Sequence, residues 1–193
     1  MARLRFRRLE TRIDAVGLIE PDLLGDERGF FVETYRRNDF AELGIREEMV
    51  QDNHSRSKRG IVRGMHFQIG EGTAKLVRCG RGQIVDVVVD LRRGSPTYGE
   101  WEAIDLNDEN GRMVYLPVGF AHGFCVVSDL ADVFYKQSNY YSDATERGIK
   151  YDDPDVGIEW PLPVAELIQS QRDATAPRLA EVAADLPFEY RRG

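Results

Sequence analysis

The middle of the chain alternates between short apolar runs and clusters of turn-forming residues. Its longest apolar run, residues 83–91, holds four valines and an isoleucine before Arg92-Arg93-Gly94-Ser95-Pro96 ends it. Short strands separated by such turns are typical of an all-β sandwich or barrel, and no helices fit between them as a doubly wound α/β fold would require. We therefore predict a mainly all-β jelly-roll barrel with short peripheral helices. The other predicted strands cover residues 61–68, 74–79, 99–106, 112–116, 121–127 and 131–138, with turns at 80–82 and 107–111.

Helices are expected only outside this central series of strands. Asn38 is predicted to cap a short helix that runs through Glu42 and is ended by Gly44. Residues 178–185 have helical composition. The Pro- and Asp-rich segment 151–163 is predicted to be an ordered loop.

The length and composition are those of one folded domain. The 193 residues are 42% hydrophobic and 31% charged, which supplies enough apolar material for a sizeable core. We expect a single jelly-roll domain over residues 1–193. Within it we expect an N-terminal strand region of about residues 1–50 and a C-terminal loop and helix tail of about residues 150–193.

The charge balance argues against a nucleic-acid partner. The net charge is −7, from 33 acidic and 26 basic side chains, whereas nucleic-acid binders are more often basic. A phosphate-bearing ligand would therefore need basic side chains gathered at one site.

The chain carries no signal that predicts a membrane or secretory role. The basic N-terminus, Met1 to Arg8, lacks the apolar run of a signal peptide, and no segment has the length of a transmembrane helix. Cys79 and Cys125 lie inside apolar runs and form no CxxC pair, so we expect both to be buried apolar residues. We predict a cytoplasmic protein with no membrane partner.

His66 is the first candidate for chemistry. It lies in Val62-Arg63-Gly64-Met65-His66-Phe67-Gln68, where alternation would place Gly64, His66 and Gln68 on one face and Arg63 on the other, unless a bulge intervenes. A polar face of this kind suits a lined cavity. A hydrogen-bonded structural histidine is the other interpretation, and the strand alone does not decide between them.

A second histidine lies in Leu116-Pro117-Val118-Gly119-Phe120-Ala121-His122-Gly123-Phe124. This stretch matches the PxGxxH signature of the cupin superfamily, whose members are jelly rolls. Most cupins hold a metal through HxH and Glu in a first motif and His in the second. Here the first motif offers His66-Phe67-Gln68, so only two of the usual ligands remain. We therefore predict no bound metal and no cofactor.

Ordered motifs along the chain resemble the dTDP-4-dehydrorhamnose 3,5-epimerase family, from near residue 5 to near residue 180. The chain departs from the family pattern in two places, because Thr73-Ala74 replaces Gln-Gly and Arg172 replaces Lys. The matching runs include Asp26-Glu27-Arg28-Gly29-Phe30-Phe31-Val32-Glu33, Val50-Gln51-Asp52-Asn53-His54-Ser55, Lys75-Leu76-Val77-Arg78, Asp86-Val87-Val88-Val89-Asp90-Leu91-Arg92, Tyr135-Lys136, Asp152-Asp153-Pro154-Asp155 and Asp173 before Ala176-Pro177, together with the two histidine stretches.

The resemblance implies an enzyme that inverts C3 and C5 of a 4-keto-6-deoxy sugar carried on dTDP. Both carbons neighbour the C4 ketone, so removal of either proton gives an enolate, and a neutral imidazole suits this task. The resemblance assigns the base to His66 and its orienting carboxylate to Asp173. It assigns proton delivery on the opposite face to Tyr135, and stabilisation of the enolate oxygen to Lys75.

The resemblance also implies a set of substrate contacts. Arginine forks match the oxygens of a diphosphate, and aromatic rings stack on a base such as thymine. The implied contacts are Arg28 and Arg63 on the phosphates with His122 in the same pocket, Phe31 and Tyr141 on thymine, Glu33, Gln51 and Asn53 as polar contacts, and Arg172 beside Asp173.

Members of this family form dimers in which an N-terminal strand crosses to the partner. We therefore expect a homodimer in which Arg28, Phe31 and Glu33 act in the neighbour's site. Such pairing would also cover an exposed strand edge.

Three alternatives to the double epimerase stay open. A relative that inverts only one carbon in an antibiotic-sugar pathway shares the same motifs. A non-catalytic sugar-nucleotide-binding cupin would be favoured by loss of His66 or Asp173, and both are present. A metal-dependent cupin oxygenase or isomerase would need the missing HxH.

Overall fold

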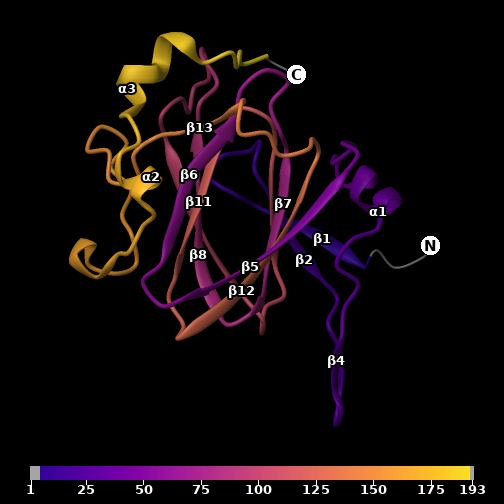
Figure 1. Ribbon diagram of the computed structural model, residues 1–193. Coiled ribbons are helices and arrows are strands. Elements are labelled where there is room, and N and C mark those ends of the chain that lie inside the picture. Colours follow the sequence, from indigo (N-terminus) through magenta and orange to yellow (C-terminus); the bar gives the residue numbers. More distant parts are fainter. Residues whose placement is uncertain (1–4, 192–193) are drawn as a thin grey trace.

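The computed structural model describes residues 5–191, whose strands form two antiparallel sheets that face each other as a jelly roll (Figure 1). The predicted all-β fold class is confirmed. One sheet contains, in order, β1 (Phe6–Leu9), β2 (Gly17–Pro21), β10 (Met113–Leu116), β7 (Lys75–Arg81), β12 (Leu130–Gln137) and β5 (Gln51–Lys58). The other contains β13 (Glu146–Gly148), β6 (Val62–Gln68), β11 (Phe120–Val126), β8 (Gln83–Asp90) and β9 (Trp101–Asn107).

Each predicted central strand is present, with ends within two residues of the expected ones. The predicted turn at residues 80–82 is too long, because β7 continues through Arg81 and the chain reverses at Gly82, with φ +76°. The sequence pattern missed β5. This strand is polar on both of its faces, and only Ser57 in it is buried, so apolar alternation gave no signal.

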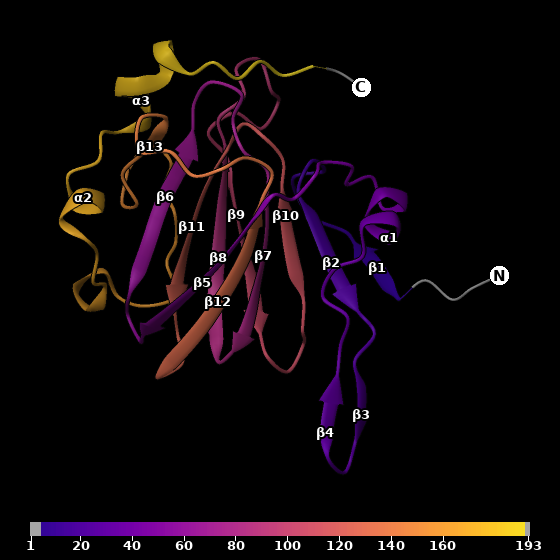
Figure 2. The same ribbon diagram turned by 45° about the vertical axis from the view of Figure 1, so that its right-hand side comes forward.

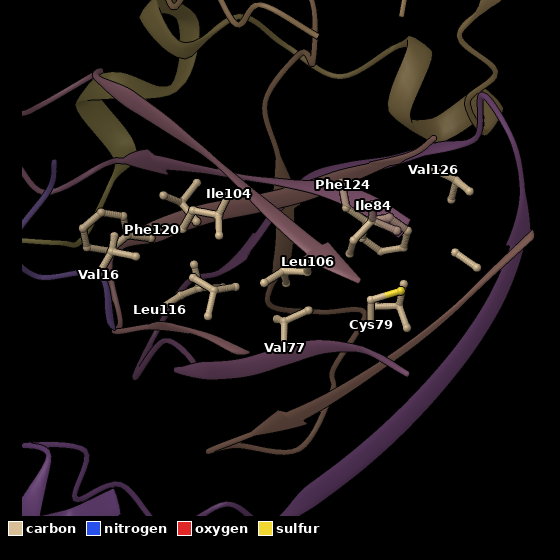
Figure 3. Close-up of a cluster of buried hydrophobic side chains, with 14 of the residues drawn as sticks. Val16, Val77, Cys79, Ile84, Ile104, Leu106, Leu116, Phe120, Phe124 and Val126 are labelled. Atoms are coloured by element: carbon tan, nitrogen blue, oxygen red, sulfur yellow. The ribbon is translucent and has the colours of Figure 1, made fainter. Parts of the chain in front are cut away.

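Apolar side chains from both sheets fill the space between them, and β7, β8, β9 and β11 supply Val77, Ile84, Leu106 and Phe124 (Figure 3). Burying each of these larger side chains contributes about 1.5–3 kcal/mol. Cys79 belongs to this core, as predicted, and Cys125 is also fully buried.

The helices are short and lie outside the barrel. Helix α1 (Arg37–Glu42) begins after Arg36, so the predicted cap at Asn38 is wrong. Its buried Phe40 packs edge-on against Phe6, at 4.9 Å between ring centroids.

The C-terminal segment packs over the outer face of β6, β8 and β11, where Leu179, Leu186 and Phe188 meet Met65 and Val87 (Figure 1). It contains a 3-10 turn, η1 (Val164–Glu166), and two α-helices, α2 (Gln171–Ala174) and α3 (Leu179–Val182); η2 (Ala183–Asp185) continues α3. The predicted helix over 178–185 is therefore confirmed, whereas α2 was not predicted. None of the described helices is long and apolar enough to cross a membrane.

A two-stranded hairpin, β3 (Leu24–Asp26) and β4 (Gly29–Phe31), extends away from the barrel (Figure 2). Leu24, Phe30 and Phe31 are each 60% exposed or more. This hairpin leaves apolar side chains without cover in the single chain.

Candidate active site

A cavity of about 490 Å³ opens between the two sheets and is closed on one side by the C-terminal segment. Side chains from β6, β7, β11 and β12 line it, together with residues 168–170, 172 and 173. Eight of the predicted site residues line this cavity: Arg63, His66, Lys75, His122, Tyr135, Tyr141, Arg172 and Asp173.

A bulge in β6 turns both Arg63 and His66 toward the cavity. His66 pairs with His122 and Arg63 with Phe124, so three steps along β6 match two along β11. The strands approach closely here, because a Cβ on Gly64 would lie 2.5 Å from the Cα of Gly123. Strict alternation would have placed Arg63 on the face opposite His66, and the bulge overturns that expectation.

His66 forms a dyad with Asp173, which is 107 positions away in sequence. The His66 Nε2 lies 2.7 Å from the Asp173 Oδ1. Helix α2 positions this carboxylate, and its N-cap Ser170 accepts a hydrogen bond from the Asp173 backbone N–H at 3.1 Å. A carboxylate that accepts from Nε2–H leaves Nδ1 of the neutral ring free to take a proton.

Asp173 is suited to stay ionised. Burial by itself would raise the pKa of Asp173, but the hydrogen bond and charge of His66 and the backbone N–H of Gly64 outweigh burial, so the pKa is lowered. An ionised carboxylate at this position would stabilise the imidazolium that forms when His66 takes a proton.

Lys75 and Tyr135 face the dyad from the opposite sheet. Burial lowers the pKa of the Lys75 ammonium to about 8, although the charges of Glu146 and Asp86 act to raise it. Burial, with the charge of Glu146, raises the pKa of Tyr135, so its phenol is protonated at neutral pH. The cavity thus holds a base on one wall and two proton donors on the other.

Two acidic residues of the site were not predicted. Asp86 is fully buried and bonds His122, with 2.8 Å between Asp86 Oδ2 and His122 Nε2. Glu146 accepts a hydrogen bond from Arg172 Nη1 at 2.7 Å. The sequence could have indicated a role for Asp86, because this acidic residue interrupts an apolar strand. Nothing in the sequence around Glu146 indicated that it lies in the cavity.

Gln51 and Asn53 lie beside the cavity without lining it. Gln51 Oε1 accepts from the Tyr141 backbone N–H at 2.8 Å, and Gln51 Nε2 donates to Asn53 Oδ1 at 2.8 Å. They therefore hold the segment that carries Tyr141.

The remaining predicted contacts do not reach the cavity of their own chain. Arg28 and Phe31 lie on the exposed hairpin, where Arg28 pairs with Asp26. Glu33 pairs with Arg5 and Arg36.

No cluster of three or more His, Cys, Asp or Glu side chains suited to a metal ion is found within residues 5–191. The sequence-based expectation of a metal-free site stays a prediction.

Comparison with known proteins matches this chain and its fold to one family. The family model described as dTDP-4-dehydrorhamnose 3,5-epimerase matches residues 10–181. The chain belongs to this family. The resemblance inferred from the motifs is therefore confirmed, and the family is one of isomerases.

Members of the epimerase family match the chain over most of its length. The dTDP-4-dehydrorhamnose 3,5-epimerase of Salmonella typhimurium is 48% identical over 174 residues, 89% of this chain and 94% of the relative. A crystal structure from Legionella pneumophila, a dTDP-6-deoxy-D-glucose-3,5-epimerase in complex with dTDP-4-keto-L-rhamnose, has a TM-score of 0.93 at 43% identity and covers 97% of this chain and 100% of its own. A dTDP-4-dehydrorhamnose 3-epimerase of Streptomyces niveus is 47% identical over 171 residues, 88% of this chain and 82% of the relative.

Proposed function

We propose that the protein inverts C3 and C5 of dTDP-4-dehydro-6-deoxy-D-glucose to give dTDP-4-dehydro-L-rhamnose. The observation that carries this proposal is the His66–Asp173 dyad on one wall of the cavity, with Lys75 and Tyr135 on the other. An inversion requires a base and an acid on opposite faces of the same carbon, and this arrangement supplies both.

In the proposed mechanism, Nδ1 of His66 removes the proton from the carbon next to the C4 ketone. The C–H electron pair enters the enolate, whose oxygen accepts a hydrogen bond from the Lys75 ammonium. The Tyr135 phenol gives its proton to the opposite face of the same carbon, which inverts it. The imidazolium and the tyrosinate then return to their starting states by proton exchange with water, and the sequence repeats at the second carbon.

The proposal is tested by incubating the protein with dTDP-4-dehydro-6-deoxy-D-glucose in D₂O and following C3 and C5 by NMR. We expect deuterium at both carbons and the L-rhamno product. No exchange at either carbon would contradict an epimerase of this substrate.

The second candidate is a single-carbon epimerase, favoured by the similarity to the Streptomyces niveus 3-epimerase. The same experiment separates the two functions. Deuterium at C3 alone, with the proton at C5 retained, would support the second candidate and exclude the first.

We further propose that the enzyme is a homodimer that exchanges its β3–β4 hairpins. Its exposed Phe30 and Phe31 support this, because apolar side chains at such exposure favour a partner surface. So does the absence of Arg28 and Phe31 from the cavity lining of their own chain. In the dimer, Arg28 would bind the diphosphate and Phe31 the thymine of the neighbour's substrate.

We also propose a cytoplasmic setting. The two buried cysteines are unpaired thiols, and desolvation raises the pKa of each to about 11. Such thiols are compatible with a reducing compartment.

A further inference from the structure

Asp86 is a fully buried carboxylate in the interior of the barrel. It lies on β8 between Ile84 and Val88, which share its face and are also fully buried. Asp90, the other fully buried carboxylate of β8, accepts hydrogen bonds from Arg92, Ser95 and Thr97.

The hydrogen bonding of Asp86 is much sparser. Its Oδ2 lies 2.8 Å from His122 Nε2, and its Oδ1 has no hydrogen-bond partner among residues 5–191. A carboxylate buried with one oxygen unpaired is unfavourable for folding, so its presence calls for an explanation in the chemistry of the site.

Three charged or titratable groups interact across this part of the cavity. Asp86 acts on His122 and on Lys75, which extends from the opposite sheet. The charge of His66 also acts on His122, and that of Glu146 also acts on Lys75. Burial raises the pKa of Asp86, while His122 and the charge of Lys75 act to lower it. Lys75 is thus the cation that can balance a negative charge on Asp86.

The dyad determines what His122 presents to a ligand. With Nε2–H directed at the carboxylate, the neutral ring offers the lone pair of Nδ1 to the cavity that His122 lines. Burial lowers the pKa of His122, which favours this neutral form. The cavity therefore presents a hydrogen-bond donor, Lys75, from one sheet and an acceptor, His122, from the other. An α-hydroxyketone, such as the C4 carbonyl and C3 hydroxyl of the proposed substrate, presents the complementary acceptor and donor.

We propose that Asp86 is a positioning residue for the epimerisation: its buried carboxylate holds the ring of His122 through Nε2 and is the counter-charge that keeps Lys75 an ammonium ion at the sugar ketone. This inference rests on the proposed function. The inference adds to the proposed function that Lys75 and His122 recognise the ketone and its neighbouring hydroxyl.

The test is the Asp86→Asn variant, which keeps an oxygen for Nε2–H but removes the charge. In the wild type, kcat/KM should fall on the basic side near the Lys75 pKa of about 8. Without the Asp86 carboxylate the pKa of Lys75 falls further, so this decline in kcat/KM, the basic limb of the pH profile, should begin about one pH unit lower. The loss of activity relative to the wild type should reach about 10-fold above neutral pH and be small below it. Tyr135 does not produce this limb, because its pKa is raised above the ordinary tyrosine value.

Asp90→Asn is the matched control, since it removes a second buried carboxylate from the same strand outside the cavity. It should lower thermal stability without moving the limb. The proposal would be overturned if the basic limb of the kcat/KM profile in Asp86→Asn coincided with that of the wild type, or if Asp90→Asn shifted it equally.

A second measurement does not depend on the variant folding. The chain has three histidines, so ¹⁵N NMR of the wild type can assign each ring. We expect His122 to carry its proton on Nε2, and a ring protonated on Nδ1 alone would refute the role given to Asp86. If the wild type exchanges neither C3 nor C5 of the substrate, the proposed function fails, whereas the ring tautomer still reports on Asp86.

Discussion

His66 and His122 show how one side chain is given two tasks by its surroundings. Each bonds a carboxylate through Nε2, at 2.7 Å to Asp173 and at 2.8 Å to Asp86. The side chain of His66 is 25% exposed, whereas that of His122 on the neighbouring strand is 8% exposed. The more open ring is suited to exchange a proton with substrate and solvent, and the enclosed ring to accept a fixed hydrogen bond.

The role of His66 is tested by His66→Ala. We expect deuterium exchange at both sugar carbons to fall by at least about 100-fold, because the variant lacks the imidazole that is proposed to remove the proton from each carbon. Affinity for dTDP, measured by calorimetry, should be unchanged, since the imidazole acts on the sugar. Normal exchange in this variant would exclude His66 as the base.

Tyr135→Phe separates proton removal from inversion. The variant keeps the ring and the base but loses the phenolic proton, so product formation should fall by about 10²- to 10⁴-fold. Deuterium should still enter the recovered substrate with retained configuration, because His66 can return a proton to the face it came from. Equal losses of exchange and inversion would place Tyr135 outside the proton-delivery step.

At the scale of elements, the bulge in β6 and the short helix α2 bring the site together. The bulge directs Arg63 and His66 into the cavity, and α2 delivers Asp173 to the ring of His66. Both features are local irregularities at the junction of the five-stranded sheet and the C-terminal segment.

The bulge depends on Gly64, so Gly64→Ala should be strongly destabilising. Gly64 has φ +134°, and an added Cβ would also meet the backbone of Gly123 at 2.5 Å. Strain and overpacking together should lower the free energy of unfolding by more than about 3 kcal/mol, measured by denaturant titration.

Gly94→Ala is the control for backbone strain. Gly94 has φ +78° but nothing within 4 Å of an added Cβ, so it should lose only about 1–2 kcal/mol. Equal losses in the two variants would show that close approach of β6 and β11 is unimportant.

At the scale of the whole molecule, the proposed exchange of hairpins implies that two chains build each site. The cavity is built from both sheets and the C-terminal segment, while the hairpin that carries Arg28 and Phe31 extends away from the barrel (Figure 2). A second copy that contributes its hairpin would complete the nucleotide side of each cavity.

Shared sites predict complementation between two defective variants. Arg28→Ala lacks a hairpin contact and His66→Ala lacks the base, so each alone should be nearly inactive. In a randomly mixed dimer, roughly a quarter of all sites combine an intact cavity with an intact hairpin from the partner. Co-refolded protein should therefore regain about that share of wild-type activity. No recovery, with dimers verified by sedimentation, would contradict the exchange of hairpins.

The sequence by itself determined seven central strands, the fold class and the family, because alternation, turn chemistry and ordered motifs are encoded over a few neighbouring residues. It missed β5, whose two faces are both polar. It also placed His66 in a strand, but it left open whether that histidine was structural. Only the tertiary structure decided that Asp173 meets His66, that Arg63 shares its face, and that Asp86 bonds His122. These relations depend on strands and segments far apart in the chain, packed together by a common core, and no local pattern records which of their side chains will meet.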